Sequence, residues 1–284
     1  MTRQITLPIE QGSSLLKTFP PLIKWPGSKR TQARQIVDLF PPQYECYYEP
    51  FVGGGSVLFQ ANPKVAICGD TCIPLINLWR FIQRHPWELL DHYQALWHRL
   101  QSEGYPVFYE IRERFNRTQN PSDLFFLSRT CVNGLIRFNQ KGEFNNSLHH
   151  TRRGIHPDRL AEVIALWLPR LQNVTFTYGD YEDTLRTLEC DDFVYLDPPY
   201  FYTKGRYQGR IDYVRFFRVL EGLNVKGIRF ALSFDGSRGH RQYITKISSN
   251  LYKRRIELES GYSSFKKVMN GSCEMVKESV YLNW

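Results

Sequence analysis

The chain has 284 residues, with 37 Lys and Arg against 28 Asp and Glu and a formal net charge of +9. This length fits one large domain or one domain with a sizeable insertion. Charged residues at 23% and aromatic residues at 15% exclude a disordered or collagen-like chain, and no apolar run approaches the roughly 20 residues that span a bilayer.

The N-terminus and the cysteines indicate a cytoplasmic protein. The first residues lack the apolar segment and the cleavage site of a secretory leader. The six cysteines are sparse and include no CxxC pair, which is typical of reduced thiols rather than of disulfides or zinc ligands. We therefore expect no metal site and no membrane association.

The positive charge concentrates in two segments. Residues 105–160 carry nine Lys and Arg against five Asp and Glu, and residues 201–218 carry five against one. Tyr and Phe lie among these charges, a pattern typical of proteins that bind a phosphate backbone. A solvated basic face without a partner fits the charge equally well, so charge alone does not decide between the two.

The first part of the chain reads as the opening of a nucleotide-binding α/β sheet. A glycine-rich turn, Gly53-Gly54-Gly55, separates the first predicted strand from a helix, and Asp70 ends the second strand. Strand, glycine turn, helix, strand and acid in this order are typical of such sheets. The predicted elements are a helix over 31–40, a strand over 44–49, a helix over 57–62 and a strand over 65–69.

The middle of the chain is helical, and the α/β alternation returns after it. Helical spacing runs over 74–100 and 108–115, interrupted by Pro86 and Pro106, and 125–142 reads as a helix that leads into a hairpin or loop. The later predicted elements are helices over 157–171, 181–187 and 241–250 and strands over 174–178, 192–196, 229–234, 252–258 and 279–284. The prediction is one α/β sheet domain interrupted by a mostly helical insertion.

A tetrapeptide, Asp197-Pro198-Pro199-Tyr200, stands at the carboxyl end of a predicted buried strand, where open α/β sheets bind ligands. The carboxylate of Asp197 and the carbonyl of Pro198 could accept both hydrogens of an exocyclic aromatic amine. The two prolines fix these acceptors in a stiff turn, and Tyr200 offers a flat face on which a base can stack. An ordinary Asp-Pro turn is the alternative.

The glycine turn predicts a cofactor site. Glycines let the backbone approach a bound molecule closely, and Asp70 follows the next strand, where a carboxylate reaches ribose hydroxyls. The turn is neither the GxGxxG dinucleotide motif nor a P-loop, so a cofactor without phosphates is favoured. A helix-capping role for Asp70 is the alternative.

In this order the motifs resemble those of the Dam-type DNA adenine-N(6) methyltransferases, which carry the DPPY tetrapeptide. The likeness covers most of the chain from Leu22 to Trp284. Residues 24–29 resemble the family's KWxGxK, residues 49–57 its EPFxGxGSV, residues 133–145 its NGLxRxN…GxFN hairpin, and residues 179–181 the segment beside the cofactor adenine. The resemblance implies a Rossmann-like S-adenosylmethionine-dependent methyltransferase domain, residues 20–75 and 156–284. It also implies an inserted target-recognition domain, residues 76–155, which carries the hairpin.

The resemblance also implies roles for single residues. The catalytic residues would be Asp197, Pro198 and Tyr200. S-adenosylmethionine would be bound by Trp25, Lys29, Glu49, Phe51, Gly53, Gly55, Asp70, Tyr181 and Asp197. DNA would be bound by Lys24, Asn133, Leu135, Arg137, Asn139, Lys141, Asn145, Arg152 and Arg153. For Arg137, bidentate reading of a guanine edge is favoured over a phosphate contact.

The segment after the hairpin departs from the family pattern. Ser147 stands where the family usually has a proline and His149 where it has a glycine. That proline helps to contact bases in the family, so the resemblance does not decide whether this chain shares the GATC specificity typical of the family. His149 and His150 read as surface or DNA-backbone residues rather than as metal ligands.

The expected reaction is transfer of a methyl group from S-adenosylmethionine to the exocyclic amine of adenine in double-stranded DNA, by direct in-line attack after base flipping. The expected protein is a monomer that binds double-stranded DNA; the sequence leaves open whether a cognate restriction endonuclease acts separately beside it or whether the enzyme is solitary. The alternatives are a non-catalytic DNA-binding relative and an RNA-adenine methyltransferase. N(4)-cytosine and glutamine methylation are disfavoured because Asp197 begins the tetrapeptide.

Overall fold

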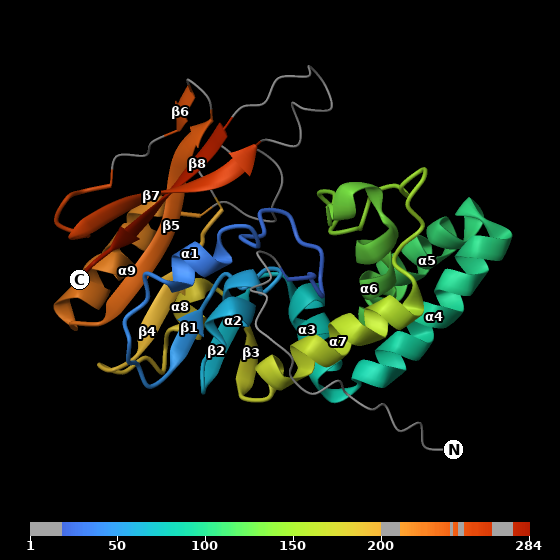
Figure 1. Cartoon of the computed structure of the whole chain (residues 1–284), viewed down its shortest axis with the longest axis horizontal. Coiled ribbons are helices and arrows are strands. Elements are labelled where there is room, and N and C mark those ends of the chain that lie inside the picture. The colour runs from blue at the N-terminus through green and yellow to red at the C-terminus, as the bar shows by residue number, and fades with distance from the viewer. Residues whose placement is uncertain (1–18, 200–210, 239–240, 244–246, 263–274) are drawn as a thin grey trace, which may run out of the picture.

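The computed structural model describes residues 19–199, 211–238, 241–243, 247–262 and 275–284. Its centre is a mixed sheet with the strand order β3-β2-β1-β4-β5-β8-β7, and β6 pairs with β5 (Figure 1). The pairs from β3 to β5 are parallel, whereas β8 is antiparallel to both of its neighbours. The strands are β1 (Tyr47–Glu49), β2 (Ala66–Asp70), β3 (Val174–Tyr178), β4 (Phe193–Leu196), β5 (Arg229–Arg238), β6 (Arg241–Tyr243), β7 (Arg254–Tyr262) and β8 (Met275–Leu282).

Both faces of the sheet are buried, because side chains alternate across each strand. In β1, Tyr47 packs into one apolar cluster and Tyr48 into the other. In β4, Phe193 belongs to the first cluster and Val194 to the second. In β1 every residue before Glu49 is therefore an aromatic residue, and in β4 every residue before Asp197 is apolar or aromatic.

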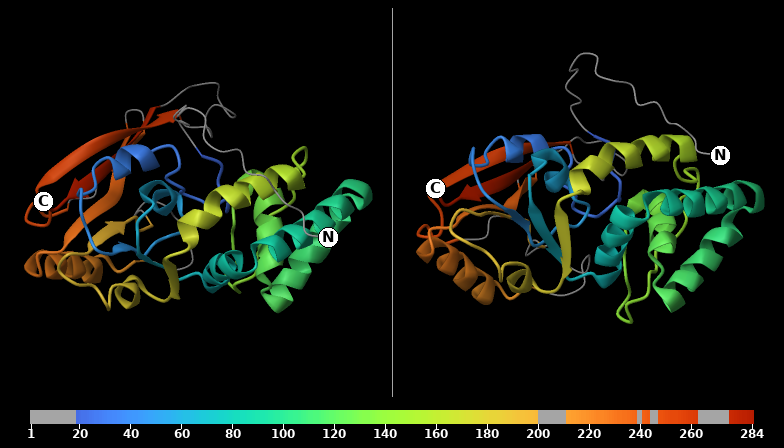
Figure 2. Two further views of the ribbon diagram at one scale, coloured as in Figure 1. Left: turned by 60° about the horizontal axis from the view of Figure 1, so that its bottom comes forward. Right: turned by 90° about the horizontal axis from the view of Figure 1, so that it is seen from below.

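Helices cover the two faces. The first cluster includes residues of α1 (Ala33–Val37), α2 (Ser56–Ala61) and α7 (Pro157–Leu171), and the second includes α9 (Tyr213–Val225) and α8 (Tyr181–Thr184). The left view of Figure 2 shows α1 and α9 on opposite sides of the sheet. The sandwich of helices around a mostly parallel sheet confirms the predicted Rossmann-like α/β fold.

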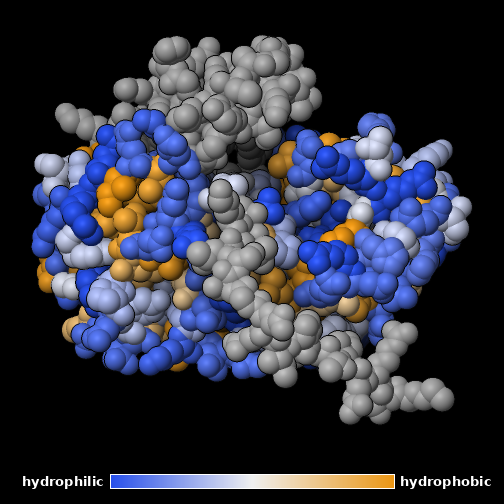
Figure 3. All heavy atoms as spheres, in the orientation of Figure 1, coloured by the Kyte–Doolittle hydropathy of each residue, from blue (hydrophilic) through white to orange (hydrophobic). Residues whose placement is uncertain are grey.

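The predicted helical insertion is present. Its helices are α3 (Ile73–Arg84), α4 (Pro86–Glu103), α5 (Tyr105–Thr118) and α6 (Pro121–Thr130). Pro86 and Pro106 lie in the first turns of α4 and α5, where a missing backbone N–H costs nothing, so they begin helices rather than break them. These helices lie beside the sheet (Figures 1 and 2), and hydrophilic side chains cover most of the face that Figure 3 shows over them.

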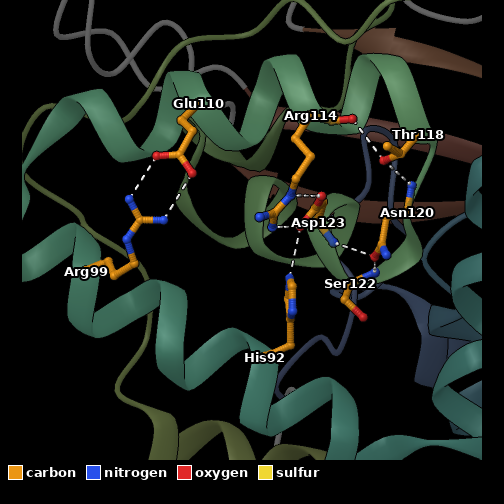
Figure 4. Close-up of polar contacts among 8 residues, drawn as sticks. All are labelled: His92, Arg99, Glu110, Arg114, Thr118, Asn120, Ser122 and Asp123. Carbon is orange, nitrogen blue, oxygen red and sulfur yellow. Dashed lines mark hydrogen bonds and ion pairs between the residues drawn. The ribbon is translucent and has the colours of Figure 1, made fainter.

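A buried carboxylate joins three of these helices. Asp123, 1% exposed in the first turn of α6, accepts hydrogen bonds from Arg114 of α5, and Nε2 of His92 of α4 lies 2.9 Å from its Oδ1 (Figure 4). Burial raises the pKa of Asp123, but the bonds from Arg114 and His92 outweigh it and hold that pKa below its usual value. At the surface, Arg99 of α4 also pairs with Glu110 of α5. The insertion is thus a packed unit rather than a set of loose helices.

The loop after α6 forms a narrow, irregular hairpin. A short 3-10 helix, η1 (Val132–Gly134), opens it, and antiparallel bridges join Cys131 to Leu148 and Phe138 to Phe144. The side chain of Asn146 donates to the carbonyl oxygens of Val132 and Leu135, at 3.0 and 2.7 Å. These side-chain bonds supplement the few backbone bonds across the hairpin, such as those from the N–H of Asn139 to Glu143 and from the N–H of Asn145 to Arg137.

Two parts of the secondary-structure prediction are wrong. The helix predicted over 241–250 is absent from its described residues, because β6 occupies 241–243 and pairs with β5. No helix was expected over 213–225, where α9 lies. Its N-cap Asp212 and the buried Phe216, Leu220 and Leu223 are a helical pattern that the sequence does contain.

Candidate active site

Three carboxylates follow three neighbouring strands of the sheet. Glu49 ends β1, Asp70 ends β2 and Asp197 follows β4, and these strands lie in the order β2-β1-β4. Because parallel strands end at the same edge, the three acids lie around one cavity of about 650 Å³. Burial raises the pKa of all three, to about 8 for Glu49 and to about 6 for both Asp70 and Asp197.

The glycine turn is shaped by a tryptophan and by Asp70. Gly53 has a φ of +46°, and a Cβ added there would lie 2.7 Å from Cδ1 of Trp25. The backbone N–H of Gly53 donates to one oxygen of Asp70 at 3.2 Å, and that of Cys72 to the other at 2.9 Å. Any side chain at Gly53 would push the indole away, so the turn and Trp25 form one concave wall.

Asp197 makes a buried ion pair. Nζ of Lys29 lies 3.0 Å from Oδ1 of Asp197 and 3.2 Å from Oε2 of Glu278, and Lys29 is only 6% exposed. Burial raises the pKa of Asp197, Lys29 lowers it and Glu278 raises it further. The sequence analysis predicts Lys29 and Asp197 but not Glu278, which comes from β8, two strands away from β4 in the sheet.

Aromatic rings form another wall. Phe51 stacks on Tyr181 with ring centroids 5.6 Å apart, and the guanidinium of Arg215 lies 5.5 Å from the centre of the Tyr181 ring. Arg215 also forms ion pairs with Asp180 and Glu182. The hydroxyl of Tyr181 and Nε2 of Gln32 are buried and have no hydrogen-bond partner among the described residues. The wall of the cavity thus combines stacked aromatic rings with buried polar atoms that have no hydrogen-bond partner among the described residues.

Most of the predicted catalytic and cofactor residues line this cavity. They are Trp25, Lys29, Glu49, Phe51, Gly53, Asp70, Tyr181, Asp197 and Pro198. Gly55 does not line it and instead caps the start of α2 with a φ of +64°. Tyr200 lies outside the described residues. The lining residues that sequence reasoning did not single out include Gln32, Asp212, Arg215 and Glu278.

The predicted DNA-binding residues lie on or beside the irregular hairpin. Leu135 lines the cavity, and Lys24 packs against Gly134, where an added Cβ would lie 2.6 Å from Cδ of the lysine. The side chain of Asn139 closes the turn by accepting from the backbone N–H groups of Lys141 and Glu143. The others, all exposed, are Asn133, Arg137, Lys141, Asn145, Arg152 and Arg153.

Among the residues that the structure describes, no group of three or more His, Cys, Asp or Glu side chains is placed to hold a metal ion. Over the same residues, no helix is both long enough and apolar enough to cross a bilayer.

Comparison with known proteins decides the family. The sequence profile described as D12 class N6 adenine-specific DNA methyltransferase matches residues 25–262. The chain belongs to this family. The predicted resemblance to DNA adenine methyltransferases is therefore confirmed, and the protein is an adenine-specific DNA methyltransferase.

Several relatives cover most of the methyltransferase. A type II methyltransferase of Lactococcus lactis subsp. cremoris is 27% identical over 235 residues, which are 76% of this chain and 81% of the relative. One of Methanocaldococcus jannaschii is 29% identical over 245 residues, 75% of this chain and 83% of the relative. A DNA adenine methylase of Salmonella typhi is 32% identical over 182 residues, 63% and 64% of the two chains.

Proposed function

We propose that the methyltransferase uses S-adenosylmethionine and methylates the exocyclic amine of an adenine flipped out of double-stranded DNA, by direct in-line attack. The observation that supports this most is one shared cavity. It is lined by Asp197 and Pro198 after β4, by the glycine turn after β1, and by Leu135 of the recognition hairpin. One cavity is therefore shared by the proposed amine acceptors, the proposed cofactor site and the hairpin that we propose to read DNA.

The cavity wall fits S-adenosylmethionine, which supplies an electrophilic methyl group on a positively charged sulfur when bound. Asp70 is held by two backbone N–H groups and can accept from ribose hydroxyls. Phe51 and Tyr181 provide an apolar aromatic surface against which an adenine ring can pack. Trp25, Lys29, Glu49 and Gly53, which also line the cavity, complete the set that we propose for this group.

The target amine would be held by the chain after β4. The carboxylate of Asp197 and the carbonyl oxygen of Pro198 accept its two hydrogens and draw the nitrogen lone pair away from the ring. The rigid Pro198-Pro199 backbone limits the entropy lost on binding. Tyr200 is proposed as the stacking surface for the flipped base.

DNA binding is proposed for the hairpin and its neighbours. Leu135 and Arg137 would read bases that flank the target, and Lys24 would contact DNA next to the target adenine. The insertion of residues 76–155 would be the target-recognition domain, and 20–75 with 156–284 the catalytic domain. We further propose that the enzyme acts as a monomer in the cytoplasm, with a cognate restriction endonuclease acting separately.

The decisive experiment is expression of the wild type and of Asp197→Ala in a methylation-free host. Long-read sequencing should find methylated adenine in one sequence context with the wild type and none with the variant. Purified Asp197→Ala should still bind duplex DNA. Wild-type protein that leaves adenines unmodified, or that binds no S-adenosylmethionine in calorimetry, would contradict the proposal.

A further inference from the structure

Glu278 joins Asp197 through a shared lysine. It comes from β8, which is antiparallel to β5, and β5 is the neighbour of β4. Lys29 contacts both carboxylates, at 3.0 and 3.2 Å, and each carboxylate side chain is 18% exposed. The lysine is more deeply buried than either acid.

The cluster is not balanced in charge. Asp197 and Glu278 carry two negative charges when ionised, and Lys29 carries one positive charge. Glu49 is the other carboxyl group next to Asp197, and burial raises its pKa to about 8, so it is largely neutral at pH 7. The other charged residues that line the cavity are Asp70, Asp180, Asp212 and Arg215.

Without Glu278, the ammonium group of Lys29 would work against methyl transfer. An ammonium group paired with Asp197 only would neutralise this carboxylate and compete with the target amine for its oxygens. A second carboxylate shares the ammonium group and restores a net negative charge beside Asp197. That charge is useful because methyl transfer leaves a positive charge on the amine nitrogen.

We propose that Glu278 is a positioning residue of the methyl transfer, which acts through Lys29 to fix the carboxylate of Asp197 and to keep its surroundings negatively charged. The inference rests on the proposed function, since it gives Asp197 the role of amine acceptor. The predicted contact of Lys29 with S-adenosylmethionine is compatible with it but is not needed for it.

The first test needs no turnover. Carboxyl carbon NMR of the ligand-free protein follows the titration of Asp197 in the wild type, Glu278→Gln and Lys29→Met. Loss of the negative charge of Glu278 should lower the pKa of Asp197, and loss of the ammonium group should raise it. Glu257→Gln is the matched control, because Glu257 lies on the neighbouring strand β7 and pairs with Arg255 and Lys277, away from the cavity.

The second test is single-turnover methylation of DNA. Glu278→Gln should be slower than the wild type by about tenfold, with less than twofold change in the affinity for S-adenosylmethionine and for DNA. The acid limb of the pH–rate profile of Glu278→Gln should lie at lower pH than that of the wild type. Glu278→Asp should recover part of the rate. A side chain that only supports the fold would lower the rate without moving the acid limb.

The outcomes separate the two proposals. Active wild type combined with an unchanged Asp197 titration in Glu278→Gln would overturn the role of Glu278 and leave the proposed function intact. A Glu278→Gln rate equal to that of Glu257→Gln would do the same. Wild-type protein that transfers no methyl group to DNA would overturn the proposed function and this inference with it.

Discussion

The hydroxyl of Tyr213 donates a 2.8 Å hydrogen bond to the carbonyl oxygen of Pro199. This bond ties the first residue of α9 to the turn that follows β4. The packing of α9 on the sheet, through Phe216 and Leu220, therefore also fixes the turn that carries Asp197. The acceptor geometry of the site is supported from outside the motif itself.

Tyr213→Phe should slow methyl transfer about three- to tenfold, because one hydrogen bond that orients the turn is worth about 0.5–1.5 kcal/mol. Single-turnover kinetics would measure the rate, and calorimetry should show unchanged affinity for S-adenosylmethionine. Tyr252→Phe is the control, since the Tyr252 ring packs on Tyr281 outside the cavity. Equal rates for the two variants would remove the role that we assign to Tyr213.

Gly134 and Gly142 make a matched pair in the hairpin. Both have positive φ, +62° and +77°, so alanine at either position should cost about 1 kcal/mol of backbone strain. Only at Gly134 would the new Cβ also strike Lys24; at Gly142 it meets no described atom within 4 Å. Urea unfolding should show a loss for both variants and a larger one for Gly134→Ala, because its Cβ also strikes Lys24, and DNA affinity should fall at least about fivefold more for Gly134→Ala. Similar DNA affinities would place Lys24 away from the DNA.

Arg137 is exposed on the hairpin, and Arg152 is exposed in the segment that follows it. Arg137→Ala should relax sequence choice at one position by about 1–3 kcal/mol, measured by competition between DNA duplexes. Arg152→Ala should instead weaken binding to all duplexes alike. It should also reduce the slope of log affinity against log salt concentration by about one, as expected for the loss of one phosphate contact. A uniform loss for Arg137→Ala would identify it as a phosphate contact.

Glu49 should make stability depend on pH. Its pKa is 4.5 in ordinary surroundings and about 8 in the folded protein, where burial is the main cause. Between these values the folded state keeps a proton that the unfolded chain releases, so the free energy of unfolding increases as the pH falls from 8. One such group contributes at most about 1.4 kcal/mol per pH unit.

Glu49→Gln should flatten this dependence between pH 6 and pH 8 in urea unfolding. In this variant the free energy of unfolding should still increase, by a smaller amount, as the pH falls below about 6. Asp70 and Asp197 cause this remaining increase, because burial raises their pKa values to about 6. The control is Glu45→Gln, an exposed carboxylate just before β1. A slope that survives in Glu49→Gln would show that another group is responsible.

The predictable part of the site consists of residues whose role follows from local pattern. Glu49, Asp70 and Asp197 each directly follow or end a short apolar strand, and parallel strands bring such positions to one edge. The glycine turn is also a local signal. For these residues, sequence neighbours alone determine the place in the fold.

The remainder depends on contacts between distant segments. Glu278 reaches Lys29 only because β8 enters the sheet between β5 and β7, and no local pattern marks that position. β6 pairs with β5, so tertiary pairing overrides the helical spacing of its segment. α9 is a different case, because its N-cap and its apolar spacing are local signals that the sequence contains, although the prediction includes no helix there.

The position of β8 has a consequence for synthesis on the ribosome. It follows all the other strands in chain order yet lies inside the sheet, between β5 and β7. Until the residues up to Leu282 have emerged, a nascent chain leaves the β5 edge open and Lys29 without its second carboxylate. The enzyme should therefore gain full activity only after β8 has emerged and paired with β5, which delays modification of DNA by chains that still lack β8.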